Sequence, residues 1–172
     1  PTPTPTPTPT PPPVTIPAGA NLCEILGHST VTSTGATAVS GSVCLDPGTS
    51  VVGFTNSQIV GPGTATGMHI NDATAITAQA DTLTLFNSLN GLPCTVTEPL
   101  IADIGGQTLT QLPGTTGVYC FPSSAAITGN LTLSGGGNFV FLIGSTITTA
   151  ANKSNVILTN RTTGSHVYWN VG

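Results

Sequence analysis

Charged residues are scarce in this sequence of 172 residues, which has two Lys and Arg against six Asp and Glu. Only 5% of the residues are charged, whereas about 25% is usual in globular proteins. At a formal net charge of -4, the chain has no basic surface that could neutralise the phosphates of a nucleic acid. The scattered carboxylates and three histidines also leave little material for acid–base or metal chemistry. The composition therefore predicts neither a nucleic-acid-binding protein nor an enzyme, and it predicts no cofactor and no metal site.

Long apolar runs are absent as well. The longest, such as residues 139–143, are far shorter than the roughly 20 residues of a membrane-spanning helix. No positively charged segment precedes an apolar one, as in a secretion signal. We therefore expect a soluble protein without a membrane span, from which any secretion signal has been removed.

Threonine is the most frequent residue, and hydrophobic residues still reach 38%. Residues 127–133 alternate apolar side chains with hydroxyls or amides, which sends the apolar ones to one face of a strand. Short runs of this kind follow one another, separated by Gly, Asn and Pro. They favour a β-solenoid over a sandwich, because hairpin signals are missing between them. The predicted strands are residues 29–33, 38–45, 107–110, 118–121, 126–133, 139–143, 146–149, 156–159 and 167–170.

Residues 71–90 are the exception and predict an amphipathic α-helix. They open with cap-type residues, Gly91 follows as a left-handed stop, and Pro93 prevents continuation. We expect the helix to cover apolar surface along one flank of the solenoid; binding a partner is the alternative. The predicted apolar stripe consists of Ala73, Ile76, Ala80, Leu83 and Phe86.

Residues 1–13 read PTPTPTPTPTPPP and predict a polyproline II tail, because proline fixes φ and restricts the residue before it. Such a segment is a semi-rigid rod on the order of 40 Å long. It is either a plain stalk or a strand for recognition or assembly, and the remaining residues, 14–172, form one domain. Sugars would stiffen the tail, and their candidate sites are Thr2, Thr4, Thr6, Thr8 and Thr10.

Few residues could carry chemistry. His28 precedes Ser29, and His69 stands near Asp72, but a His beside an Asp is more often a structural pair than a catalytic one. The carboxylates that a polysaccharide-cleaving β-helix would need are isolated in turn-like contexts; they are Asp46, Glu98 and Asp103. Three sequons predict N-glycosylation in an organism that glycosylates, at Asn130, Asn152 and Asn160.

The four cysteines are even in number and lack CxxC spacing, so zinc or redox motifs are weakly supported. Two disulfides fit a chain this poor in charge, and an oxidising extracellular compartment would follow; free buried thiols are the alternative. Four cysteines allow three pairings, and their spacing alone does not choose between them.

Outward rows of threonine suggest a further function. A rigid array of Thr methyls can order water while the hydroxyls anchor it, and the spacing of about 4.7 Å between coils comes close to lattice spacings of ice. The alternative is that Thr is only a soluble strand former.

Taken together, these motifs resemble the microbial ice-binding proteins that fold as a discontinuous β-solenoid with a flanking helix. The resemblance runs from about Leu22 to Gly172, with order, spacing and motif words in agreement. Its motifs are Gly27-His-Ser-Thr-Val-Thr-Ser-Thr-Gly-Ala-Thr, Val39-Ser-Gly-Ser-Val-Cys-Leu-Asp-Pro-Gly-Thr, Val52-Gly-Phe, Ala78-Gln-Ala-Asp, Leu92-Pro-Cys-Thr, Gly105-Gly-Gln-Thr-Leu-Thr, Pro113-Gly, Gly117-Val-Tyr-Cys-Phe, Leu131-Thr-Leu, Phe139-Val-Phe-Leu-Ile-Gly-Ser-Thr-Ile-Thr-Thr-Ala and Val167-Tyr-Trp-Asn-Val-Gly.

The resemblance implies a right-handed, three-faced β-helix, secretion, no enzyme activity and often binding to ice. Family members usually continue past the segment similar to residues 167–172 with further Thr-bearing coils, so we expect these coils to be absent here. With this fold in mind, the expected disulfides are Cys94–Cys120 and Cys23–Cys44; on the chain-entropy model the first adds about 3 to 4 kcal/mol.

Two functions follow from these expectations. The first is a non-enzymatic extracellular structural subunit that assembles with copies of itself into a glycosylated filament or surface layer, because open strand edges are templates for pairing. The alternative is an ice-binding protein. The candidate ice-face residues are Thr146 and Thr148.

Overall fold

The computed structural model describes residues 11–35, 37–54, 67–96 and 102–172. The chain falls into two compact units. We call Thr15–Asn87 the N-terminal unit and Ser88–Gly172, with Pro1–Val14, the C-terminal unit. Most of the Thr-Pro tail lies outside the described residues, so its polyproline II conformation stays a prediction, as does the single domain over residues 14–172.

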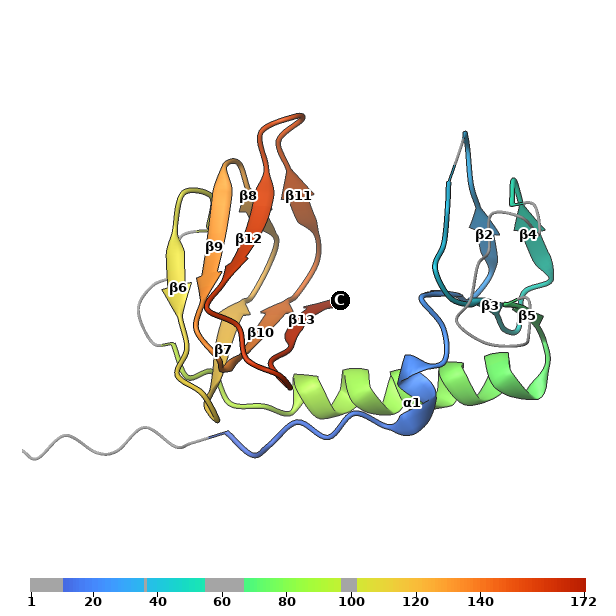
Figure 1. Cartoon of the computed structure of the whole chain (residues 1–172), viewed down its shortest axis with the longest axis horizontal. Coiled ribbons are helices and arrows are strands. Elements are labelled where there is room, and N and C mark those ends of the chain that lie inside the picture. Colours follow the sequence, from blue (N-terminus) through green and yellow to red (C-terminus); the bar gives the residue numbers. More distant parts are fainter. Residues whose placement is uncertain (1–10, 36, 55–66, 97–101) are drawn as a thin grey trace, which may run out of the picture. The chain divides into compact units, whose positions relative to one another are not determined.

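In the C-terminal unit, successive strands visit three parallel sheets in turn. The sheet orders are β12-β9-β6, β13-β10-β7 and β11-β8. The first two coils therefore contribute one strand to each side of a three-sided solenoid, and β12 and β13 add a third strand to two of the sides (Figure 1). The right-handed sense of this winding stays a prediction. The strands are β6 (Thr108–Thr110), β7 (Thr116–Phe121), β8 (Ala125–Ile127), β9 (Asn130–Ser134), β10 (Asn138–Ile143), β11 (Ile147–Thr149), β12 (Asn155–Thr159) and β13 (Val167–Val171).

The N-terminal unit has shorter parallel strands in two sheets, ordered β1-β3-β5 and β2-β4. It also contains a 3-10 helix, η1 (Ala18–Asn21), and most of the α-helix α1 (Ala73–Asn90). The strands are β1 (Ile25–Gly27), β2 (Thr30–Thr32), β3 (Val43–Leu45), β4 (Ser50–Val52) and β5 (Met68–Ile70).

Stacked aromatic rings form the core of the C-terminal unit. Parallel pairing places Tyr119, Phe141 and Trp169 in register on β7, β10 and β13. The ring centroids lie 5.1 Å apart between Tyr119 and Phe141 and 4.2 Å apart between Phe141 and Trp169, within the range of favourable ring stacking. Regular coils therefore turn one sequence position into a continuous column of stacked rings, of which Tyr119 and Phe141 are buried.

Helix α1 begins where the sequence predicts a cap, but it buries a different face. Asp72 accepts a hydrogen bond from the backbone N–H of Ala75 at 3.0 Å, as an N-cap residue does. The predicted stripe is wrong: Ile76 is 52% and Leu83 60% exposed, whereas the buried positions are Ala75, Ala78 and Leu89.

The physical reason is close packing through small side chains. A Cβ added at Gly19 would lie 2.8 Å from Cγ2 of Thr77 and 2.7 Å from Oδ2 of Asp81, so η1 approaches α1 over its small and polar side. The backbone N–H of Gly19 donates to the Asp81 carboxylate at 2.8 Å. Hydrophobicity alone therefore selected the wrong side of the helix.

Most predicted strands match observed ones, with three kinds of difference. The predicted run 38–45 is a strand only at Val43–Leu45, which is β3. The predicted run 126–133 is two strands, β8 and β9, because the chain turns a corner of the solenoid at Thr128 and Gly129. Strands β1, β4 and β5 lie outside the predicted runs. No helix in the described ranges is long and apolar enough to cross a membrane.

Each unit contains one disulfide. Cys23 is bonded to Cys44 in the N-terminal unit, and Cys94 to Cys120 in the C-terminal unit. This is the predicted pairing. Free cysteines are absent, so the alternative of buried thiols does not apply to this structure.

Candidate functional site

The side of the C-terminal solenoid built from β8 and β11 carries both predicted ice-face residues. The two strands pair in register, with Thr148 beside Ala126 and Ile147 beside Ala125. Ala125 is buried in the core, so alternation directs Ala126 and Thr148 outward. We call the outward residues Ser124, Ala126, Thr128, Thr146 and Thr148 the β8–β11 face.

Side-chain hydrogen bonds hold this face in place. The hydroxyl of Thr146 donates to that of Ser124 at 2.8 Å, and the hydroxyl of Thr128 donates to the Asp103 carboxylate. Asp103 also accepts from the backbone N–H groups of Gly105 at 2.9 Å and Thr128 at 3.0 Å. The hydroxyl of Thr128, followed by these N–H groups, lowers the pKa of Asp103 below its ordinary value. The carboxylate is therefore committed to structure.

Thr148 is the exposed centre of the β8–β11 face. Its hydroxyl makes no hydrogen bond to any of the described residues, and its neighbour Ala126 carries only a methyl group. Because all side chains of the face are small, none rises above the rest. The arrangement combines methyl groups and the hydroxyl of Thr148 on strands that side-chain hydrogen bonds hold in place.

Of these five residues, the sequence predicts Thr146 and Thr148, at β11 and just before it, but not Ser124, Ala126 and Thr128 on the preceding coil. Ser124 and Ala126 lie opposite Thr146 and Thr148 only because 22 residues separate equivalent positions on successive coils. Coil length is a property of the folded chain. The only signal in the sequence is a short Ser-Ala-Ala-Ile-Thr run, of which the predicted strand 126–133 includes the last three residues.

The candidates for acid–base chemistry lie apart and have structural partners. Nδ1 of His69 lies 2.7 Å from Oδ2 of Asp72 at the start of α1, and Nδ1 of His28 lies 3.2 Å from Nε2 of Gln79. The same Gln79 amide donates to the backbone oxygen of Asp46 at 2.8 Å. The described residues contain no group of three His, Cys, Asp or Glu side chains that could hold a metal; Glu98 lies outside them.

The sequons all lie at the surface, although two of their asparagines are engaged. Asn130 accepts a hydrogen bond from Asn155 at 2.9 Å, and Asn160 donates to Ser134 at 3.1 Å. Asn152 occupies a turn with φ of 56°. Glycosylation at these sites stays a prediction, and the candidate threonines of the tail lie outside the described residues.

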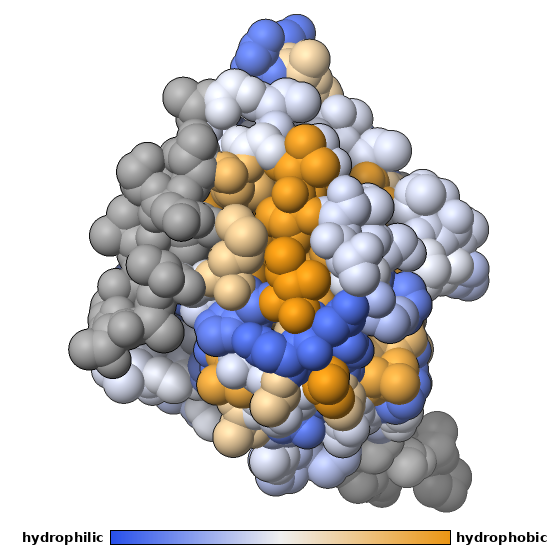
Figure 2. All heavy atoms as spheres, turned by 90° about the vertical axis from the view of Figure 1, so that its right-hand side faces the viewer, coloured by the Kyte–Doolittle hydropathy of each residue, from blue (hydrophilic) through white to orange (hydrophobic). Residues whose placement is uncertain are grey.

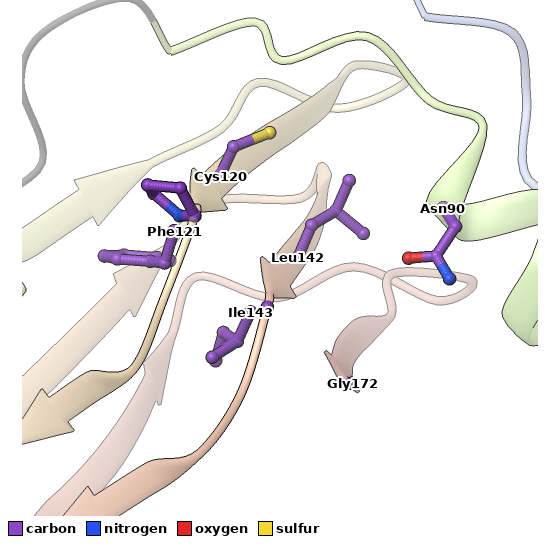
Figure 3. A pocket seen from close by; sticks show the side chains of 8 residues that line it. Asn90, Cys120, Phe121, Leu142, Ile143 and Gly172 are labelled. Atoms are coloured by element: carbon purple, nitrogen blue, oxygen red, sulfur yellow. The ribbon is translucent and has the colours of Figure 1, made fainter.

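The C-terminal unit also has a shallow hollow of about 390 Å³ at the ends of β7 and β10 (Figure 3). Cys120 and Leu142 point to one side of these strands, while Phe121 and Ile143 point to the other. Asn90 from the end of α1 lies at its rim and accepts a hydrogen bond from Asn170 at 2.8 Å. The lining is mostly apolar, and none of its side chains is charged.

A second hollow of about 430 Å³ lies beside α1 in the N-terminal unit. It is lined by His28, Asp46, Ile76, Gln79, Ala80 and Leu83. Apolar residues also form a band over the side of this unit where β4 and β5 lie, with a hydrophilic band next to it (Figure 2). On this side Val52 is 54% and Ile70 37% exposed.

Comparison with known proteins identifies the family of the chain. The model of the Ice-binding-like family matches residues 25–172. An ice-binding protein of Nostoc sp. (strain HG1) is 39% identical over 153 residues, which make up 86% of this chain and 52% of that protein. The chain thus spans about half the length of this curated relative.

Solved structures agree with the family assignment. An ice-binding protein from the Antarctic ascomycete Antarctomyces psychrotrophicus is 34% identical, with a TM-score of 0.75 over 90% of this chain and 72% of that one. An ice-binding protein from an Antarctic biological consortium is 26% identical, with a TM-score of 0.57 over 99% of this chain and 90% of the other. The family match, the curated relative and these structures show that the chain belongs to the Ice-binding-like family.

Proposed function

We propose that this protein binds ice, and that the β8–β11 face is a site of binding. The observation that carries the proposal is the exposed position of Thr148 in register with Ala126, at the centre of a face made only of Ser, Ala and Thr. Methyls at strand spacing favour an ordered layer of water, and hydroxyls anchor it. The ice-binding relatives support the same function.

The site is rigid enough for this function. Ala125 and Ile127 beneath it are 2% and 3% exposed, and the hydroxyl of Ser154 donates to the carbonyl of Ile127 at the corner after β11. A surface that matches a lattice must keep its spacing without further ordering on binding, since ordering costs free energy. Secretion fits this function, because two disulfides are typical of an oxidising compartment.

The test compares Thr148→Tyr with Leu83→Tyr. The first places a bulky ring on the β8–β11 face, and the second places the same ring on an exposed position of α1. We expect the wild type and Leu83→Tyr to shape ice crystals and depress the freezing point, and Thr148→Tyr to lose most of that activity at an unchanged melting temperature. Wild-type protein that leaves growing ice crystals unshaped would contradict ice binding.

A structural subunit is the second candidate. Val156 and Leu158 on β12 are 43% and 53% exposed, and an apolar strand with free backbone groups can pair with another chain. The predicted packing of residues 1–13 along a neighbouring copy concerns a segment that lies mostly outside the described residues. Light scattering with and without residues 1–13 separates this candidate from ice binding, because a monomer in both cases would rule out the filament.

A further inference from the structure

A second side of the C-terminal solenoid carries a larger regular array of hydroxyls and methyls. Sheet β12-β9-β6 aligns its outward residues in two complete rows across three coils. One row is Thr108, Thr132 and Ile157; the other is Thr110, Ser134 and Thr159. We call these six residues the β6–β9–β12 face. It contains one more strand than the β8–β11 face. In each row, the residues of β6 and β12 pair directly with the same residue of β9.

The core holds this face in position from below. Leu131 and Leu133 of β9 are fully buried, and Leu109 of β6 packs against the same cluster. At one end of the face, Asn155 donates to Asn130 at 2.9 Å; at the other, Asn160 donates to Ser134 at 3.1 Å. These bonds cross from β12 to β9, so they resist sliding of one strand along the other. The face therefore has a fixed repeat in both directions.

The hydroxyls of this face are available to water. Those of Thr108, Thr110, Thr132 and Thr159 make no hydrogen bond to any residue in the described part of the chain. On the β8–β11 face, by contrast, the hydroxyls of Thr128 and Thr146 are already donated to protein groups. Four free threonine hydroxyls in register are therefore a stronger anchor for ordered water than the single free hydroxyl of Thr148.

The chemistry of the β6–β9–β12 face excludes most other ligands. None of its six residues is charged, so it has no means of attracting phosphates, carboxylates or cations. It also has no aromatic ring on which a sugar or base could stack. Ile157, at 39% exposure, adds a methyl surface beside Thr132. What remains is a rigid, neutral lattice of methyls and hydroxyls.

We propose that the β6–β9–β12 face is a second ice-binding site, which takes a different crystal plane from the β8–β11 face. The inference rests on the proposed function. The two faces belong to different sheets of the same three-sided solenoid, so a single flat plane of ice cannot contact both at once. Their residues also differ in arrangement: three strands in one face and two in the other. Each face therefore selects its own plane.

The test labels the N-terminal amine with a fluorophore and records which planes of a single ice crystal become fluorescent. The variants are Thr132→Tyr for the β6–β9–β12 face, Thr148→Tyr for the β8–β11 face, and Leu83→Tyr as the control. We expect the wild type and the control to label two sets of planes. Thr132→Tyr should lose the label on one set of planes and Thr148→Tyr the label on the other set. Each variant should still label the set of planes that the other variant no longer labels.

The outcomes separate the two proposals. Two outcomes would overturn the β6–β9–β12 site and leave ice binding standing. In the first, Thr148→Tyr labels no plane although the wild type does; in the second, folded Thr132→Tyr keeps the wild-type pattern. If the wild type labels no plane, ice binding itself fails. Should Thr132→Tyr lower the melting temperature, Thr110→Tyr on the exposed edge strand β6 replaces it, with the same expected loss of one set of planes.

Discussion

The two units build the same parallel coils from very different amounts of core. The C-terminal unit buries ten residues in one cluster that includes Tyr119, Phe139 and Phe141. Among the described residues of the N-terminal unit, which leave out 36 and 55–66, the buried cluster has four, with Val43 and Leu45 at its centre and no aromatic ring among them. Since stabilisation follows the apolar area buried, we expect the described part of the N-terminal unit to gain less from its core and to depend more on specific bonds.

Those bonds are visible in the N-terminal unit. Glu24 accepts a hydrogen bond from the backbone N–H of Ser42 at 2.5 Å, next to the Cys23–Cys44 disulfide, and Asp81 accepts one from Gly19. A carboxylate that accepts a backbone N–H makes a stronger bond than a neutral acceptor. A solenoid coil too short for a large core can therefore be stabilised by a disulfide and by carboxylates that accept hydrogen bonds from backbone N–H groups.

The largest effect that we expect comes from removing the central ring of the C-terminal column. Phe141→Ala should lower the free energy of unfolding by about 3–5 kcal/mol, because it loses buried area and leaves a cavity between two stacked rings. Leu45→Ala is the counterpart in the N-terminal unit, with about 2–5 kcal/mol. Hydrogen exchange reports each loss by segment. If Phe141→Ala deprotects β3 as much as β10, the division into two cores is wrong.

A smaller but more selective effect should follow from removing the disulfides one at a time. Replacing Cys23 and Cys44 by Ala, or Cys94 and Cys120 by Ala, should cost about 3 kcal/mol each on the chain-entropy model, since the closed loops are similar in length. The same loss matters more where the core is small. We expect the first double variant to lose protection in β3 at a temperature where the second keeps protection in β10.

Equal protection in both double variants would contradict the view that the N-terminal unit depends on its bridge. Reduction of the wild type with a thiol is the matched control, because it opens both bridges without changing the sequence. It should reproduce the deprotection of β3 first.

The sequence predicted much of this fold, and the failures have a common cause. The helix ends were predictable because Asp72 and Gly91 are local signals, and β10 because its apolar run is long. The buried side of α1 was not, since Ala75 and Ala78 carry little hydrophobicity and yet are buried by tertiary packing. Likewise Thr148 could be found by alternation, but its neighbour Ala126 depends on the length of the coil. Local patterns were therefore reliable, whereas properties set by packing between distant segments were not.

The smallest effect that we expect is a difference between the two units in local opening at acidic pH. The Ala75 N–H and then the His69 side chain lower the pKa of Asp72 below its ordinary value. A carboxyl group with a lowered folded-state pKa stabilises the fold at pH values above its pKa in the unfolded chain, which is about 3.9 for Asp. This stabilisation is lost as the pH falls through the folded-state pKa. The start of α1 should therefore loosen below about pH 4, an effect kept small by solvent exposure of the carboxylate.

Asp72→Asn sharpens this prediction, because asparagine still caps a helix but does not titrate. Amide exchange at Ala75, followed from pH 6 to pH 3, should rise above its intrinsic pH dependence in the wild type and not in Asp72→Asn. Asp103→Asn is the matched variant in the C-terminal unit, where exchange at Gly105 reports the carboxylate whose pKa is lowered by Thr128. Because Asp103 lies beside the larger core, its loop should open less in acid than the start of α1. Greater opening at Gly105 than at Ala75 would reverse the order of stability that the two cores predict.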